Sequence, residues 1–170
     1  LQNEMGVLSS NKIHKEVVKK LKSNVEFYTI GNIKNTQNHS TEWFNDYDFN
    51  FKINTDTITK GLKYEFILSD EAMEIIEYNE FSDFVSSVKF KGFSSETYNH
   101  NLPFDISIRD PIEKLDGVKK SIIIKPFDFV VDRFVSLVKI NETGKDSDQL
   151  ELVLRLSNPK IANDYINTLI

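Results

Sequence analysis

Apolar residues recur at helical spacing near both ends of this chain. Toward the N-terminus they fall three or four residues apart, at Ile13, Val17, Val18 and Leu21. Toward the C-terminus they do so at Ile161, Ala162, Tyr165, Ile166 and Leu169. Such spacing places the apolar side chains on one face of a helix. One helix is therefore predicted near each end of the chain.

Residues able to cap a helix precede both predicted helices. The candidate caps are Ser9, Ser10 and Asn11 for the first helix, and Ser157 and Asn158 for the second. Pro159 suits the first turn of the second helix, because its missing N–H would have no partner there. Residues 4–8, just before the first helix, are compatible with the end of another helix.

Strands are predicted where apolar and other residues alternate, or where apolar residues form a compact run. The segments are 25–30, 49–53, 62–68, 73–76, 88–90, 104–108, 122–124 and 150–156. Residues 127–134 predict a short helix, and a strand over 135–140 follows it. The polar segment 35–46 is interpreted as a loop. The last two strands can pair as a hairpin, although the connection between them is long for one.

This order of elements predicts an α+β fold, in which a mixed or antiparallel sheet packs against N- and C-terminal helices. With 170 residues the chain is long enough for one domain with a substantial core, so residues 1–170 are expected to form a single domain. The sequence begins with Leu1 and stops on Leu169-Ile170, without a cap or polar tail. We therefore expect a piece of a longer protein.

The composition restricts the classes of function that this chain can have. A formal net charge of -5 argues against a nucleic-acid surface. The absence of cysteine excludes disulfides, thiolate metal sites and cysteine nucleophiles, but it leaves the cellular compartment open. No apolar run approaches the ~20 residues that span a bilayer.

Sequence motifs for catalysis or cofactor binding are missing. Neither of the glycine-rich phosphate patterns, G-x-x-x-x-G-K-[ST] and G-x-G-x-x-G, occurs, and G-x-S-x-G and H-E-x-x-H are also absent. His14, His39 and His100 each stand alone in polar sequence and are interpreted as solvated surface side chains. We therefore expect no catalytic, cofactor-binding or metal-binding residues in this chain.

Two clusters of side chains are candidate contact surfaces. Trp43, Phe44 and Tyr47, if exposed, could stack on sugar rings or contact a partner; packing at the entrance of a strand is the favoured alternative. The lysines between residues 12 and 22 could touch an acidic surface. The favoured interpretation for these lysines is the solvated face of an amphipathic helix.

Several strings of residues resemble one protein family. They are residues 4–21, residues 24–28 (Asn-Val-Glu-Phe-Tyr) with 31–34 (Gly-Asn-Ile-Lys), residues 127–140, 150–156 and 158–169. Together they resemble the periplasmic domain of bacterial polysaccharide chain-length determinants of the exopolysaccharide tyrosine-autokinase type, in the version seen in Bacteroidetes. Residues 36–120 match by pattern more than by residue.

The resemblance implies a membrane-anchored, homo-oligomeric co-polymerase at the periplasmic face of the bacterial inner membrane. Its implied partners are a polysaccharide, the polysaccharide polymerase and outer-membrane export components, and it implies no cofactor for this domain. The family's kinase chemistry resides in a cytoplasmic domain that is not in these residues, so the chain is expected to be non-catalytic. The alternatives are a secreted or lipoprotein glycan-binding module that uses Trp43, and a hydrolase with paired carboxylates in a cleft.

Overall fold

The computed structural model describes residues 2–69, 72–92, 94–96, 98–108, 119–144 and 149–170. The helices are α1 (Gln2–Leu8), α2 (Asn11–Leu21), α3 (Ser40–Asp46), the 3-10 helix η1 (Thr55–Thr57), α4 (Phe127–Leu137) and α5 (Pro159–Leu169). The strands are β1 (Val25–Ile30), β2 (Thr36–Asn38), β3 (Tyr47–Phe51), β4 (Leu62–Ser69), β5 (Ala72–Tyr78), β6 (Phe84–Lys91), β7 (Phe104–Ile108), β8 (Lys119–Ile124), β9 (Lys139–Glu142) and β10 (Leu150–Val153). The α+β prediction, with helices at both ends of the sequence, is confirmed.

The main sheet has six strands in the order β2-β1-β8-β4-β5-β6, and each neighbouring pair is antiparallel. Its register aligns apolar residues in rows across strands: Ile122 lies opposite Phe27 on one side and opposite Tyr64 on the other. All three side chains are buried. The alternation that predicted these strands therefore reflects one face of the sheet that packs into a core.

A second layer covers this face. It consists of α3 and the antiparallel pair β3–β7, in which Phe51 lies opposite Phe104. The sheet cluster, as we call this core, contains Val25, Phe27, Trp43, Tyr47, Tyr64, Phe66, Leu68, Met73, Ile75, Phe90, Leu102, Phe104, Ile106, Ile122 and Ile124. Phe104 is at its centre, with its ring centroid 5.1 Å from Tyr64 and 5.6 Å from Phe49.

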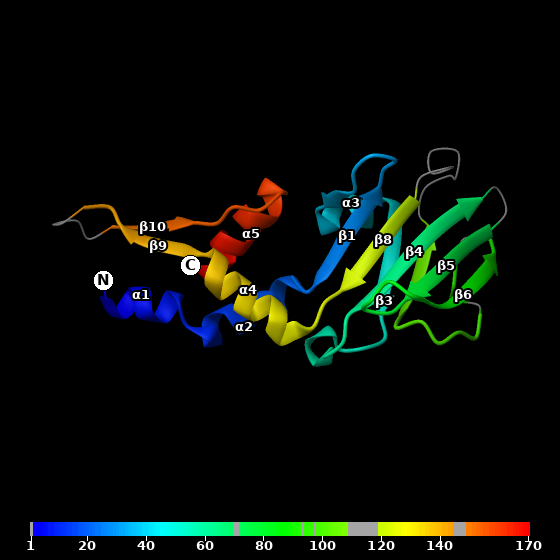
Figure 1. The fold of residues 1–170 in the computed structure, drawn as a ribbon, viewed down its shortest axis with the longest axis horizontal. Coiled ribbons are helices and arrows are strands. Elements are labelled where there is room, and N and C mark those ends of the chain that lie inside the picture. The colour runs from blue at the N-terminus through cyan, green and yellow to red at the C-terminus, as the bar shows by residue number, and fades with distance from the viewer. Residues whose placement is uncertain (1, 70–71, 93, 97, 109–118, 145–148) are drawn as a thin grey trace.

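The remaining helices form a second core beside the sheet. The helical cluster contains Val17, Val18, Phe127, Val130, Val131, Phe134, Val138, Tyr165 and Leu169, and the β9–β10 pair packs against it. The rings of Phe134 and Tyr165 stack with their centroids 3.8 Å apart, which joins α4 to α5. Figure 1 shows α1, α2, α4, α5 and β9–β10 at one end of an elongated molecule, the helical lobe, and the six-stranded sheet with α3 and β3 at the other end, the sheet lobe.

Three predicted boundaries were wrong. Residues 35–46 form β2 and α3 instead of a loop, because His39 caps α3 and the buried Trp43 fixes the helix on the core. Residues 135–137 continue α4, and the strand begins only at Lys139, because the N–H of Val138 still bonds to the carbonyl of Phe134. β10 ends at Val153, and the two following leucines of the predicted strand pack on the helical cluster.

The histidines are buried, so their interpretation as surface side chains was wrong. His14 on α2 has no exposed surface, and its Nδ1 lies 2.7 Å from the Tyr165 hydroxyl of α5. The His100 side chain is 1% exposed, with Nε2 3.0 Å from Asp105. His39 is described with the candidate site below. Each histidine has a hydrogen-bonding partner that the polar sequence around it does not reveal.

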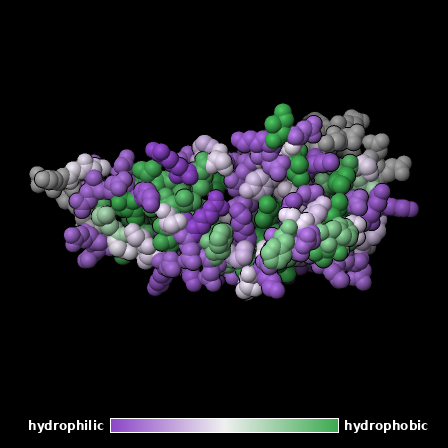
Figure 2. Space-filling view, viewed as in Figure 1, coloured by the Kyte–Doolittle hydropathy of each residue, from purple (hydrophilic) through white to green (hydrophobic). Residues whose placement is uncertain are grey.

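None of the described helices is long and apolar enough to cross a membrane. In the view of Figure 2, polar side chains cover most of both lobes, with apolar side chains interspersed between them. The exposed large apolar side chains include Phe81 and Phe84 near the start of β6 and Phe129 on α4.

Replacing Phe104 by alanine should destabilise the sheet lobe strongly. The ring is fully buried against four aromatic neighbours, and truncating a buried Phe costs about 3–5 kcal/mol. The matched control is Phe84→Ala, because that ring is 66% exposed. Urea unfolding should show a large loss of unfolding free energy for Phe104→Ala and a much smaller one for the control; equal losses would contradict this account of the core.

The stability of the protein should fall on acidification through His14. Burial lowers the pKa of His14, an effect that the backbone of Leu8 opposes in part. The unfolded chain therefore binds a proton more readily than the folded one, so the free energy of unfolding decreases as the pH falls below about 6.5. One such proton changes stability by at most about 1.4 kcal/mol per pH unit.

Thermal or urea unfolding between pH 7.5 and 5 measures this effect in the wild type and in His14→Gln, in which glutamine retains an acceptor for Tyr165. The wild type should lose more stability than His14→Gln over this range. The other titrating groups are common to both proteins, so parallel pH profiles would show that His14 contributes nothing.

Candidate functional site

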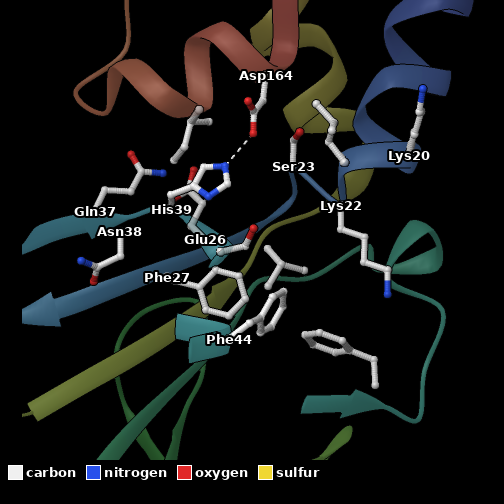
Figure 3. A pocket seen from close by; sticks show the side chains of 15 residues that line it. Lys20, Lys22, Ser23, Glu26, Phe27, Gln37, Asn38, His39, Phe44 and Asp164 are labelled. Carbon is white, nitrogen blue, oxygen red and sulfur yellow. Dashed lines mark hydrogen bonds and ion pairs between the residues drawn. The ribbon is translucent and has the colours of Figure 1, made fainter. Parts of the chain in front are cut away.

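A cavity of about 300 Å³ lies where the helical lobe meets the sheet lobe. Its walls come from the end of α2 and the turn after it, from β1, from residues 37–40, and from Phe44, Phe51, Ile161 and Asp164 (Figure 3). The cavity is thus built by segments that are far apart in the sequence. Its place at the junction of the lobes makes it the candidate functional site.

The turn after α2 brings one lysine to this cavity. Lys22 adopts a left-handed backbone conformation with φ 49°, and its N–H bonds to the carbonyl of Lys19 at the helix end. Its Nζ lies 5.1 Å from the centroid of the Phe51 ring, which lines the same cavity. Asn24 then ties the turn to the sheet lobe, since its Nδ2 donates to the carbonyl of Thr55 over 2.8 Å.

His39 connects the lobes at one side of the cavity. It precedes α3 as its N-cap, and its Nδ1 accepts the backbone N–H of Thr41 over 3.2 Å. In the neutral ring the proton then resides on Nε2, which donates to Oδ2 of Asp164 over 2.7 Å. Asp164 belongs to α5, so this hydrogen bond joins the sheet lobe to the C-terminal helix.

The start of α5 is fastened to the same edge of the sheet. The Asn158 side chain caps α5 through its oxygen, and its Nδ2 donates to the carbonyl of Gln37 over 3.1 Å. Lys160 donates from Nζ to the Thr41 hydroxyl over 2.7 Å. Since β2 and α3 were predicted as loop, none of these contacts could be expected from the sequence.

The carboxylate of Glu26, near the start of β1, also lines the cavity. It is 5% exposed and is surrounded by cations: Oε2 lies 2.7 Å from Lys125 Nζ, and Oε1 3.0 Å from Arg133 of α4. The Tyr28 hydroxyl donates to Oε2 over 2.7 Å. Burial, and secondarily the Glu26 carboxylate, raises the pKa of Tyr28, so the hydroxyl keeps the proton that it donates.

The three aromatic candidate residues differ in exposure. Trp43 and Tyr47 have no exposed surface, and the Nζ of Lys120 lies 5.2 Å and 4.8 Å from their ring centroids. Neither ring is accessible to a sugar in this structure, and both pack in the sheet cluster. Phe44 is 38% exposed and lines the cavity. Of the three, the structure brings only Phe44 to the site.

Sequence reasoning missed the polar groups of the site. Glu26 carries a signal, because a carboxylate between Val25 and Phe27 in an apolar strand is unusual. His39 and Asp164 carry none, since they are 125 positions apart in the chain. The lysines of α2 are exposed, as the solvated-face interpretation predicted; Lys15, for example, pairs with Asp128 over 3.2 Å.

The cavity combines an aromatic wall, amide and hydroxyl groups, and two carboxylates that both have partners. Among the described residues, no group of three or more His, Cys, Asp or Glu side chains could hold a metal ion. This arrangement can bind a polar ligand, and neighbouring donors hold both carboxylates in place.

Comparison with known proteins adds no family assignment: no protein-family model matches the chain, and neither does any curated protein sequence. The resemblance to polysaccharide chain-length determinants therefore rests on the strings of residues given above.

Replacing Glu26 by glutamine should weaken the junction of the lobes. The change leaves Lys125 and Arg133 without their buried counter-charge; because these cations are partly solvated, we expect a loss of about 2 kcal/mol instead of the larger cost of a fully buried pair. Asp128→Asn is the control, since its pair with Lys15 is exposed and is worth less than about 1 kcal/mol. Urea unfolding at pH 7 measures both variants, and a Glu26→Gln loss no larger than that of the control would argue against this role.

Proposed function

We propose that this chain is the periplasmic domain of a membrane-anchored polysaccharide co-polymerase, which regulates the chain length and export of an exopolysaccharide. The domain itself is non-catalytic and works by positioning subunits and partners. The full-length protein is a tyrosine autokinase whose kinase domain lies in the cytoplasm. The family resemblance supports this proposal, and one structural observation carries it further.

That observation is the position of α2, near the start of the chain, and of α5, the last helix. α2 and α5 pack against each other in the helical lobe, where the buried His14 meets Tyr165. Both ends of the chain therefore lie in the helical lobe, and the sheet lobe extends away from them (Figure 1). A domain held between two membrane anchors needs this geometry, with the helical lobe toward the membrane and the sheet lobe directed into the periplasm.

In this role the domain forms a homo-oligomer through the full-length protein. It contacts the polysaccharide polymerase, outer-membrane export components and the growing polysaccharide, and it couples the periplasmic state to the cytoplasmic kinase. The non-catalytic assignment is supported by the family resemblance, in which the kinase chemistry belongs to a separate cytoplasmic domain. The alternative of a secreted glycan-binding module rested on Trp43 as an exposed contact, and its burial removes that support.

Disruption of the gene in the source bacterium should change the size distribution of its surface polysaccharide, because a chain-length regulator sets that distribution. Gel electrophoresis of extracted polysaccharide measures the change, and the intact gene supplied in trans should reverse it. An unchanged distribution would overturn the co-polymerase proposal.

A labelling experiment tests whether the domain lies in the periplasm or in the cytoplasm. The chain has no cysteine, and Ile33 is fully exposed, so Ile33→Cys in the full-length protein introduces a single reactive thiol into this domain. A membrane-impermeant maleimide should label it in spheroplasts before lysis. Labelling that appears only after lysis would place the domain in the cytoplasm.

A further inference from the structure

We propose that the cavity between the lobes binds one neutral sugar ring of a glycan, with Phe44 as the surface on which the ring stacks. The inference rests on the function proposed above, because it names the site at which the domain meets the polysaccharide. Four features of the cavity lead to it: its aromatic wall, its oriented amide, its charge distribution and its size.

The aromatic wall is the first feature. The Phe44 ring is 38% exposed and is held in place by Phe27, whose ring centroid lies 5.7 Å away in an edge-to-face arrangement. Figure 3 shows Phe27 and Phe44 together at one side of the cavity, facing the polar groups of the other side. A held ring with one open face offers an apolar surface to the C–H groups of a pyranose at little entropic cost.

The oriented amide is the second feature. The Oε1 of Gln37 accepts a hydrogen bond from the Ser157 hydroxyl over 3.1 Å, which directs the amide nitrogen to the other side. In Figure 3 this nitrogen points into the cavity. Gln37 therefore presents a donor, and the carboxylates of Glu26 and Asp164 present acceptors, to a ligand that carries hydroxyl groups.

The charge distribution is the third feature. Lys20 and Lys22 are exposed at the rim. The carboxylate of Glu26 is buried, and that of Asp164 points toward His39 with its side chain 45% exposed. An anionic group inside the cavity would meet two carboxylates, and a cation would compete with Lys125, Arg133 and His39 for them. A neutral hydroxylated ligand avoids both costs, since it uses donors and acceptors without adding charge.

Size is the fourth feature. A volume of about 300 Å³ is at the lower end of the range for ligand pockets and suits one sugar ring of a longer chain. A lipid tail would desolvate the Gln37 amide nitrogen that points into the cavity without offering it an acceptor. The combination of ring, amide and carboxylates matches a neutral sugar unit better than a phosphate, a metal ion or an apolar ligand.

The test uses the 170-residue chain itself. Trp43 is the single tryptophan of the chain, and its ring centroid lies 5.1 Å from that of Phe27 in the cavity wall. The fluorescence of Trp43 therefore reports on the site. The probes are D-glucose, D-galactose and D-mannose, D-glucuronate, and oligosaccharides prepared by partial hydrolysis of the polysaccharide of the source strain. Backbone amide NMR spectra locate any binding site.

We expect saturable shifts at residues 37–40 and 44 with at least one neutral probe. Phe44→Leu, which keeps apolar volume but removes the ring face, should weaken binding at least about fivefold. Gln37→Ala should weaken it by about two- to tenfold through loss of one hydrogen bond. Phe84→Ala, which removes an exposed ring from β6, should bind as the wild type does.

Several outcomes would overturn the inference. These are the absence of saturable binding by every neutral probe and oligosaccharide, binding of glucuronate alone, and equal binding by Phe44→Leu and the wild type. The spectral dispersion and melting temperature of each variant verify that it is folded.

Failure of this inference is distinguishable from failure of the proposed function. If gene disruption alters polysaccharide length but a Phe44→Leu full-length protein restores it completely and the chain binds no sugar, the co-polymerase stands and the cavity is not its glycan site. If sugars bind at the cavity but disruption leaves polysaccharide length unchanged, the site stands and the co-polymerase proposal fails.

Discussion

The relative placement of the two lobes depends on one buried carboxylate. Glu26 projects from β1, and its two oxygens meet Lys125, just after β8, and Arg133, on α4. A largely desolvated carboxylate requires such partners in good geometry. Without them, its unpaired charge would lower the free energy of unfolding by roughly several kcal/mol. This requirement fixes how the chain passes from the sheet into α4. The first strand of the sheet lobe thus sets the position of a central helix of the helical lobe.

This constraint matters because the hydrophobic cores of the two lobes are separate. The sheet cluster and the helical cluster share no member, and the hydrogen bond between His39 and Asp164 is a polar contact across the junction. Interfaces between such separate cores resemble transient protein–protein interfaces more than they resemble a continuous core. The same polar character leaves a cavity with hydrogen-bonding walls where the lobes meet.

The parts of the fold that the sequence predicts are those with one-sided burial. β4 buries Tyr64, Phe66 and Leu68 on a single face, so the alternation of its residues is visible in isolation. The short helix α3 has no such pattern, because its stability comes from tertiary contacts such as those of Trp43. The site was missed for a related reason: Arg133 lies 107 positions from Glu26 and Asp164 lies 125 positions from His39, and only the folded chain brings these pairs together.

In the function proposed here, the cavity connects ligand binding to the relative placement of the two lobes. Its walls include β1 and the aromatic side chain of Phe44 from the sheet lobe, but also Ile161 and Asp164 of α5. A ligand that touches both sides favours the orientation of the lobes in which the walls fit it, by as much as its affinity differs between orientations. α5 is the last helix of the chain and packs on α2 near the other end. Occupancy of the cavity and the geometry of the helical lobe are therefore energetically linked. In the proposed co-polymerase, this link is a physical route from a bound ligand to the two ends of the domain.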